Sequence, residues 1–291
     1  MLSAIKTNTK LQAKLGRRAI RRAIQTASFG RQAVESSPIF FANSFPKSGT
    51  HLLTQILQGF ARIGPAVNSG LPAIVTFEGE SGQPRAENII LKELRRLIPG
   101  DIAYGHLHSS PGVVSFLCSP GVAAYLLIRD PRDVVVSHVY YVTEITSHHA
   151  LHHYYFEELQ DFNERLKTSI LGRPDWNQPF PDIRTRFDPY LGWMENPEIL
   201  VLRFEDLQTN MRETIRRVLE HASARGFRVI KTNKLAVDVL IAGVYPQRSP
   251  TFRRGKIGSW RTSFTVEHKQ IFKEVAGDLL IKLGYEQDNG W

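Results

Sequence analysis

Residues 38–51 read Pro38-Ile39-Phe40-Phe41-Ala42-Asn43-Ser44-Phe45-Pro46-Lys47-Ser48-Gly49-Thr50-His51. An apolar run is followed by a turn rich in Lys, Ser, Gly and Thr, and then by apolar residues at helical spacing. The pattern predicts a strand, a loop and a helix whose backbone N–H groups and Lys47 face a bound anion. In the loop of nucleoside triphosphatases the lysine follows a glycine, whereas here Lys47 precedes Gly49 and the first glycine is missing. The stretch therefore predicts a phosphate site without the usual metal–nucleotide geometry.

Two later segments carry arginines at positions suited to phosphate. The first is an apolar strand over 122–128 that ends at Arg129 and continues through Pro131 into a helix with Ser137. The second, residues 252–261, reads Phe252-Arg253-Arg254-Gly255-Lys256-Ile257-Gly258-Ser259-Trp260-Arg261. Arginine forks match phosphate oxygens, and a glycine lets the backbone approach them closely. The alternatives are an ion pair of Arg129 with Asp130 or Asp133, and solvated loop charges for Arg253 and Arg254.

The three segments together, in order and at familiar spacing, resemble the PAPS-dependent sulfotransferases. This family moves a sulfuryl group from 3′-phosphoadenosine-5′-phosphosulfate (PAPS) to an acceptor, releases PAP and needs no metal. The resemblance runs over about residues 38–283 and indicates a divergent member of the cytosolic type. It implies that the 5′ end of PAPS is held by Lys47, Ser48, Gly49, Thr50 and His51. It implies that the 3′-phosphate is held by Arg129, Ser137, Arg253, Arg254 and Gly255, while Phe204 keeps a stacking surface where the family often has tyrosine.

Candidate catalytic residues follow from the chemistry and from the same resemblance. Tyr104-Gly105-His106-Leu107-His108 ends a predicted strand, so His106 and His108 share one face. Histidine titrates near neutral pH and suits a general base. The family's base lies in Lys-Thr-His-Leu-Pro, which implies His106 as the base, with His108 second, and Lys47 as the cation on the leaving phosphate. The alternative is a hydrogen-bonded strand histidine without a catalytic role.

The expected fold class is α/β, a P-loop-like three-layer fold with a central parallel sheet flanked by helices. Residues 1–36 are predicted to form a basic amphipathic extension and 37–291 a single sulfotransferase domain. Residues 64–85 and 245–263, which are rich in small and turn-forming residues, are predicted to be mobile loops over the site. The predicted strands are 38–44, 101–107, 122–128 and 199–204. The predicted helices are 50–63, 86–97, 133–145, 156–171, 205–222 and 265–283.

Several positions depart from the family's pattern. Tyr104 stands where the family has a lysine, so one positive charge near the transferring group is missing or supplied elsewhere. Leu52 stands where an aromatic residue often stacks on adenine. The family's dimerisation signature is altered at both charged ends, Arg261 and Gln270, so we expect a monomer or a weak homodimer.

The charge of the chain is concentrated at its N-terminus. The formal net charge is +9, yet residues 1–34 hold eight of the 37 lysines and arginines and none of the 28 acidic residues. The body is therefore almost neutral, and nucleic acid is not an expected partner. The basic N-terminal helix can lie on an anionic membrane, serve as an organelle transit peptide or pack on the body. A single cysteine, Cys118, suits a reducing compartment, so we expect a cytoplasmic protein with peripheral membrane contact through this helix.

Three functional hypotheses remain at this stage. The favoured one is a sulfotransferase acting on a hydroxyl or amine of a small-molecule, lipid or glycan acceptor. The alternatives are a non-catalytic PAP- or PAPS-binding protein of the same fold and a small P-loop kinase, which the loop order disfavours. The histidines at 148, 149, 152 and 153 have helical metal-ligand spacing, but acceptor contact or plain surface is favoured and no metal site is expected.

Overall fold

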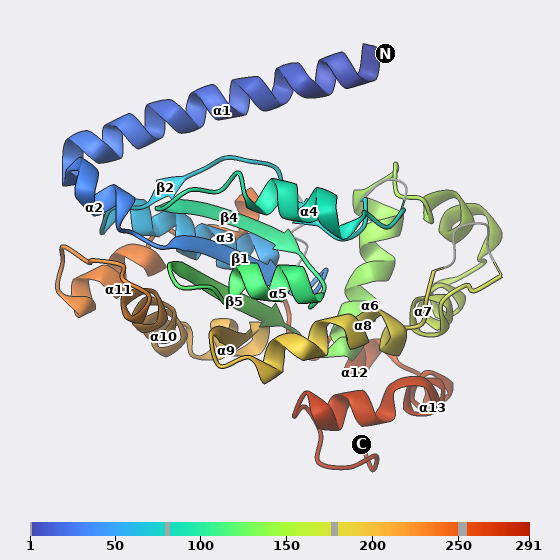
Figure 1. Ribbon diagram of the computed structural model, residues 1–291. Coiled ribbons are helices and arrows are strands. Elements are labelled where there is room, and N and C mark those ends of the chain that lie inside the picture. The colour runs from blue at the N-terminus through green and yellow to red at the C-terminus, as the bar shows by residue number, and fades with distance from the viewer. Residues whose placement is uncertain (1, 79–81, 176–179, 250–254) are drawn as a thin grey trace.

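The computed structural model describes residues 2–78, 82–175, 180–249 and 255–291 of the chain, with side chains from residue 9 onward. Its centre is a parallel sheet in the order β2-β4-β1-β5-β6, with β3 pairing on β4 (Figure 1). The strands are β1 Ile39–Ser44, β2 Val67–Asn68, β3 Ile74–Val75, β4 Asp101–His106, β5 Val122–Ile128 and β6 Ile199–Arg203. The four longer strands agree with prediction to within one residue at each end, because each is an apolar run bounded by polar or turn residues.

The described helices surround this sheet. Those before β5 are α1 Leu2–Phe29, α2 Arg31–Glu35, α3 Thr50–Gln58, α4 Glu87–Leu94 and α5 Pro111–Leu117. The later ones are α6 Pro131–Tyr140, α7 Phe162–Leu171, α8 Ile183–Leu191, α9 Phe204–Thr209, α10 Met211–Ala224, α11 Asn233–Ile241, α12 Trp260–Ser263 and α13 Val266–Lys282. Short 3-10 segments are η1 Gly59–Arg62, η4 Gly192–Glu195 and η5 Pro246–Arg248, and π-helical segments are η2 Tyr141–Ile145 and η3 Tyr154–Glu158.

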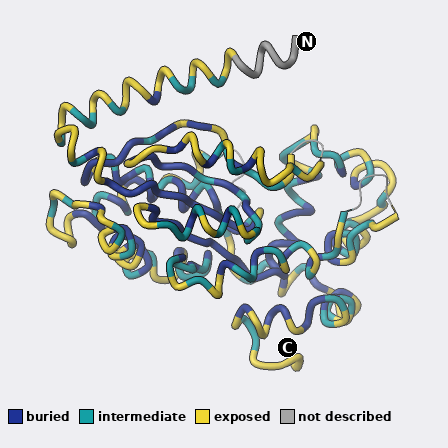
Figure 2. The backbone as a smooth tube through the Cα atoms, in the orientation of Figure 1, coloured by how far each residue is buried: buried dark blue, intermediate teal, exposed yellow. Residues whose placement is uncertain are grey.

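Alternating side chains of the buried strands build two cores, one on each face of the sheet. On β1, Phe40 and Ala42 pack with α3, α10 and α11, whereas Ile39 and Phe41 pack with α4, α5 and α13. All six residues of β1 are buried, as expected for a central parallel strand covered on both faces. Figure 2 shows the strands dark and the outer turns of the helices exposed. The predicted three-layer α/β class is confirmed.

The segment 64–85 differs from its prediction as a mobile loop. It contains β2 and β3, and Val67 and Ile74 are buried in the sheet. Each of the two strands is only two residues long, too short for period-two alternation to be recognised in the sequence.

Several helices also begin or end away from their predicted bounds. The clearest case is the helix predicted over 156–171, which begins at Phe162. It begins there because the Asp161 side chain caps it by accepting from the N–H groups of Asn163 and Glu164.

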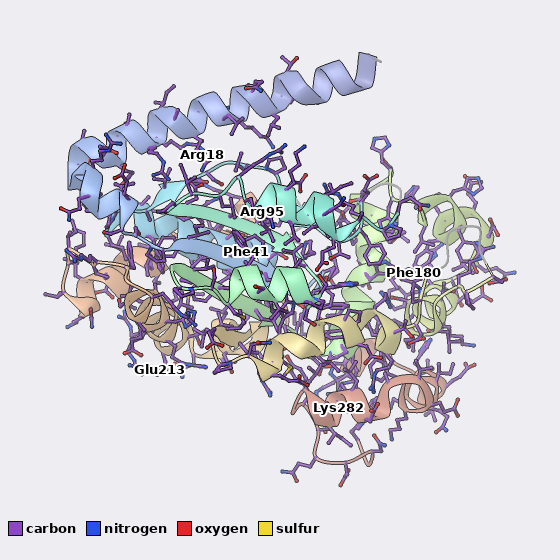
Figure 3. All side chains as sticks on the ribbon, viewed as in Figure 1. Arg18, Phe41, Arg95, Phe180, Glu213 and Lys282 are labelled. Carbon is purple, nitrogen blue, oxygen red and sulfur yellow. The ribbon has the colours of Figure 1, made fainter. Side chains whose placement is uncertain are left out.

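The basic helix α1 is anchored to the body by buried charge. Arg18 is 8% exposed and its Nε donates to Asp101 Oδ1 (3.1 Å), while its Nη1 donates to the Arg96 carbonyl. Arg22 also pairs with the fully buried Asp101 at 3.2 Å. Figure 3 shows Arg18 between α1 and the sheet. Packing on the body, one of the three roles considered for this helix, is therefore present, and no described helix is long and apolar enough to cross a membrane.

We predict that Arg18→Ala lowers the free energy of unfolding by about 3 kcal/mol, because it strips a buried carboxylate of its main partner. The adjacent residue Arg17 is exposed and gives a matched control. Arg17→Ala should change the free energy of unfolding by less than about 0.5 kcal/mol. Denaturant unfolding of the two variants measures both effects. Equal stability of the two variants would show that the Arg18–Asp101 contact does not hold α1 to the body.

Candidate active site at the carboxyl ends of the strands

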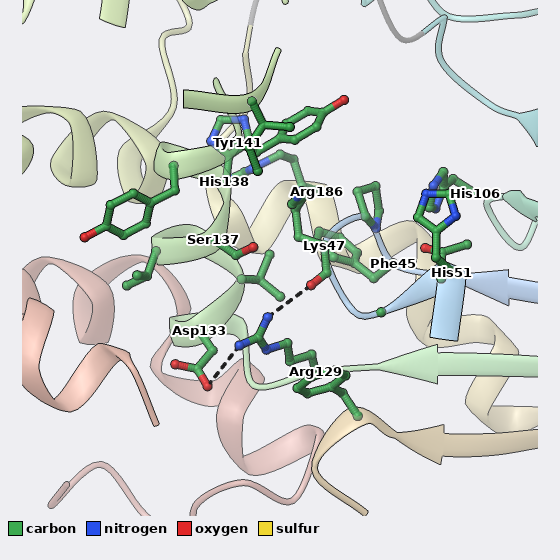
Figure 4. Close-up of a pocket in the computed structure, with 18 of the residues that line it drawn as sticks. Phe45, Lys47, His51, His106, Arg129, Asp133, Ser137, His138, Tyr141 and Arg186 are labelled. Carbon is green, nitrogen blue, oxygen red and sulfur yellow. Dashed lines mark hydrogen bonds and ion pairs between the residues drawn. The ribbon is translucent and has the colours of Figure 1, made fainter. Parts of the chain in front are cut away.

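The candidate site lies where β1, β4, β5 and β6 end. A cavity of about 860 Å³ opens there and is lined by residues from the end or the following loop of each of these strands. They include Lys47 after β1, His106 at the end of β4, Arg129 after β5 and Phe204 after β6. Ligand sites of open parallel sheets are found at this edge. Figure 4 shows Lys47, His106 and Arg129 converging on one space. With Phe204, which lines the same cavity, four of the predicted site segments meet.

The loop after β1 forms a cradle that requires its particular backbone. Gly49 caps α3 with a φ of 100°, and a Cβ there would lie 2.7 Å from the Phe204 ring. Lys47 also adopts a positive φ, of 69°, which non-glycine residues rarely do outside strained functional loops. The N–H groups of Thr50 and His51, the first two of α3, have no carbonyl partner within the helix and are available to an anion. The next two, of Leu52 and Leu53, donate to the Gly49 carbonyl. The Thr50 hydroxyl is held by the Ser44 hydroxyl at 2.7 Å.

Two buried polar atoms of the site lack partners in the described chain. They are Ser48 Oγ, on a fully buried residue of the cradle, and Arg129 Nε. Unpartnered buried polar atoms are uncommon and costly unless a ligand supplies the missing bond. The cradle and Arg129 are thus built to receive hydrogen-bonding ligand atoms.

Lys47 is a cation in an apolar and positively charged setting. Its ammonium lies 3.7 Å from the centre of the Tyr141 ring, and the residue lines the cavity. Burial, reinforced by the positive charge of Arg129, lowers the pKa of Lys47 to about 7. Burial also lowers the pKa of His51, which follows the cradle on α3. An anionic ligand would offset the repulsion between Lys47 and Arg129 and restore the proton on Lys47.

Arg129 joins the cradle to the loop before α12. Its Nη1 donates to the Lys47 carbonyl (3.4 Å) and its Nη2 to the Lys256 carbonyl (2.8 Å). The guanidinium lies 3.6 Å from Asp133 and stacks at 4.5 Å over the Phe204 ring. The ion-pair alternative therefore holds for Asp133, while Asp130 pairs with Arg132. The Nε of the same guanidinium is buried and makes no hydrogen bond within the described residues.

Asp133 holds the segment from Gly258 to Trp260, at the start of α12, against the site. It was not among the predicted site residues. Its carboxylate accepts from the backbone N–H groups of Gly258 (2.7 Å) and Trp260 (3.0 Å). Gly255 and Ser137 line the same cavity. Arg253 and Arg254 lie outside the described residues, so their predicted role stays a prediction. A buried aspartate one turn after a strand-end arginine is a signal that could have identified this contact.

His106 is held with one nitrogen directed to the backbone. Its Nδ1 donates to the Ser44 carbonyl (2.9 Å), since a carbonyl can only accept, and this leaves the Nε2 lone pair free. Burial lowers the pKa of His106, so its imidazole is neutral at neutral pH. His108 lines the same cavity, and burial lowers its pKa to about 4. Both histidines face the cavity, as their spacing predicts.

Asn43 positions the histidine segment and was not recognised from the sequence. Its side chain bonds both backbone groups of Leu107, donating to the carbonyl (2.9 Å) and accepting from the N–H (2.8 Å). Gly105 is required there because a Cβ would lie 2.0 Å from the Ile74 carbonyl oxygen. A polar residue inside the apolar run of β1 is the signal that points to such a role.

The aromatic and histidine segment after α6 divides between cavity, core and surface. Tyr140 and Tyr141 line the cavity, Tyr155 is buried in the core, and Phe156 is 62% exposed. Of the four clustered histidines, His149 lines the cavity. Among the described residues, no group of three or more His, Cys, Asp or Glu side chains is arranged to hold a metal ion.

Comparison with known proteins gives the class. The family model of the sulfotransferase domain matches residues 101–284. The chain is 22% identical to 3-alpha-hydroxysteroid sulfotransferase of Cavia porcellus over 253 residues (80% of each chain) and 27% identical to sulfotransferase 2A1 of Mus musculus over 259 residues (80% of each). The chain belongs to the sulfotransferase domain family, whose members transfer sulfuryl groups. The cradle at 44–51 precedes the matched region.

Solved structures give the same fold. Mouse sulfotransferase SULT7A1 complexed with PAP superposes with a TM-score of 0.54, 17% identity and coverage of 90% of this chain and 89% of that one. Retinol dehydratase in complex with androsterone and PAP gives a TM-score of 0.57 at 14% identity, over 85% and 83% of the two chains. The predicted family and fold are both confirmed.

We predict that Gly49→Ala destabilises the protein by about 1–3 kcal/mol, because alanine is strained at this positive φ and meets the Phe204 ring. Gly16→Ala is the control, since a Cβ at Gly16 in α1 meets nothing within 4 Å and alanine favours a helix. Denaturant unfolding compares the two. A Gly49→Ala protein as stable as the wild type would contradict the assigned cradle geometry.

Proposed function

We propose that this chain transfers the sulfuryl group of PAPS to a hydroxyl or amine of a small-molecule, lipid or glycan acceptor. The observation that carries the proposal is the pair of buried, unpartnered groups, Ser48 Oγ and Arg129 Nε, on two cation-bearing segments that border one cavity. PAPS has two anionic ends, and each segment supplies donors for one of them. Both solved relatives are complexes with PAP, which supports the same donor.

The residues divide the work by their chemistry. Lys47, Ser48, Gly49, Thr50 and His51 would hold the 5′ phosphosulfate through N–H groups, hydroxyls and charge. Arg129, Ser137 and Gly255, with Arg253 and Arg254 beyond the described residues, would hold the 3′-phosphate. The Phe204 ring lies under the Arg129 guanidinium and beside Gly49. It would thus support the residues for the 3′-phosphate and those for the 5′ phosphosulfate.

His106 would accept the acceptor's proton at Nε2 as the acceptor attacks sulfur. The Nδ1 hydrogen bond to Ser44 fixes the tautomer, and the lowered pKa keeps the ring neutral and ready to accept a proton. Lys47 would stabilise the negative charge that develops on the leaving phosphate. Tyr141, packed against the ammonium at 3.7 Å, holds Lys47 in the cavity.

The acceptor class is supported in part by relatives. One relative is a hydroxysteroid sulfotransferase, and the solved structures of retinol dehydratase hold androsterone or retinol; all of these ligands are small apolar molecules. Phe45, Tyr140, Tyr190 and Leu151 give this cavity an aromatic and aliphatic wall of the same character. Cytoplasmic location, membrane contact through α1 and a monomer or weak homodimer stay predictions. In α1, Ile20 and Ile24 are 63% and 58% exposed.

The first test is transfer of labelled sulfate from PAPS to a broad acceptor library without added metal. We expect turnover by the wild type and a loss of about 10²–10⁴-fold in kcat for His106→Ala, with PAP affinity unchanged. His221→Ala is the control, because this half-buried histidine packs on Tyr125 away from the cavity. Tight PAP binding without any turnover would favour the non-catalytic alternative. Phosphate transfer from ATP and magnesium would favour the kinase.

We predict a pH dependence of PAP binding that belongs to Lys47. Its pKa is lowered to about 7 in the free protein, and a bound anion raises it, so binding takes up a proton. PAP affinity should therefore be highest below about pH 7 and weaken by up to about tenfold per pH unit above it. Calorimetric titrations of the wild type and Lys47→Arg across this range test the effect.

The arginine variant stays protonated throughout, so its profile reports the titration of the ligand's own phosphates. We expect the decline above pH 7 to be present in the wild type and absent in Lys47→Arg. Identical profiles for the two proteins would contradict contact between Lys47 and the bound nucleotide.

A further inference from the structure

Arg186 reaches the cavity from α8. It lines the same cavity as Lys47 and His106, and Figure 4 shows it next to His138 and Tyr141. No sequence motif marks this residue or its helix. Because Arg186 comes from α8 and not from the strand ends that carry the proposed nucleotide residues, we assign it to the acceptor side of the site.

The hydrogen bonds of Arg186 leave its charge uncompensated. Its Nη2 donates to the Ser169 carbonyl and its Nε to the Asp182 carbonyl (3.4 Å), both of which are neutral acceptors. The guanidinium stacks at 4.3 Å on the Phe180 ring. Within the described chain its Nη1 makes no hydrogen bond, and no carboxylate lies within 4 Å of the guanidinium.

Two titratable groups, Asp182 and Tyr155, interact with the charge of Arg186, but neither forms an ion pair with it among the described residues. The Asp182 carboxylate is occupied as the cap of α8, where it accepts from the N–H and the hydroxyl of Thr185, both at 2.8 Å. Burial raises the pKa of the Tyr155 phenol, so that group stays uncharged. Burial lowers the pKa of Arg186 to about 10, which leaves it protonated at neutral pH.

The surroundings add positive rather than negative charge. Burial lowers the pKa of the His138 imidazole, and the charges of Arg186 and Lys47 lower it further, so the two cations act on the same region. Among the described residues that line the cavity, the acidic ones are Asp133 and Glu78. Asp133 is engaged by Arg129 and by backbone N–H groups, and Glu78 is exposed. A partly buried arginine with free N–H groups and no counter-ion is a ready-made oxyanion partner.

We propose that the acceptor carries an oxyanion group, a carboxylate or its equivalent, which binds Arg186 while the acceptor's hydroxyl faces His106. This inference rests on the proposed sulfotransferase function and narrows its acceptor to an anionic amphiphile. The aromatic and aliphatic wall of the cavity, including Phe45 and Tyr190, would cover the apolar part between the two ends. Uncharged acceptors such as simple sterols would leave Arg186 without a counter-ion.

The test is a binding comparison that does not need catalysis. The PAP-saturated protein is titrated with a series of (4-hydroxyphenyl)alkanoates of increasing chain length and with the matching primary amides. We expect the best-fitting acid to bind about 10- to 100-fold more tightly than its amide, as for a charge-assisted hydrogen bond to arginine. Arg186→Met should abolish this preference, and Arg186→Lys, which keeps charge without the planar fork, should retain part of it.

Arg184→Met is the matched control. Arg184 lies two residues before Arg186 on the same helix, and it pairs with the surface carboxylates of Asp188 and Asp278. This variant should keep the full preference for acids, and PAP binding by each variant reports that the fold is intact. The inference is overturned if no acid binds more tightly than its amide, or if the preference survives in Arg186→Met. Failure of the proposed function would instead appear as absence of PAP binding or of sulfate transfer.

Discussion

Four parallel strands end at one edge of the sheet, and every group of the candidate site depends on that arrangement. β1 delivers the cradle with Lys47, β4 delivers His106, β5 delivers Arg129 and β6 delivers Phe204. The pairing of β1 with both β4 and β5 sets the spacing of the first three. Because both faces of these strands are buried in separate cores, their ends cannot shift without disturbing the packing. The sheet thereby pre-organises groups that are distant in sequence.

Charge is placed at this edge at a cost in stability. Lys47, Arg129 and Arg186 line one cavity. Burial and the charge of Arg129 lower the pKa of Lys47, and burial with the charges of Arg186 and Lys47 lowers the pKa of His138. Buried like charges are unfavourable unless a ligand neutralises them. A doubly anionic nucleotide on one side and an anionic acceptor on the other would supply that neutralisation. The energetics of burial thus favour anionic ligands at this site.

The sequence predicted the fold and the meeting of the cradle, His106 and Arg129 at one edge of the sheet, because these depend on local patterns. Apolar runs predicted the four long strands, and the Lys47–Thr50 order separated this cradle from a metal–nucleotide loop. The positioning contacts were beyond such reasoning. Asn43 acts through the backbone of Leu107, and Arg186 reaches the cavity from a helix that is remote in sequence from every motif. Contacts of this kind arise from tertiary packing, which neither periodicity nor spacing encodes.

The central claim is that the cradle and Arg129 hold the two phosphate ends of one nucleotide without a metal. Calorimetric titration with PAP and with adenosine 5′-phosphate, in the presence of a chelator, tests it most directly. The account predicts that PAP binds at least about 100-fold more tightly, since only PAP can engage the Arg129 set through its 3′-phosphate. Equal affinity for the two nucleotides, or binding that requires magnesium, would contradict it.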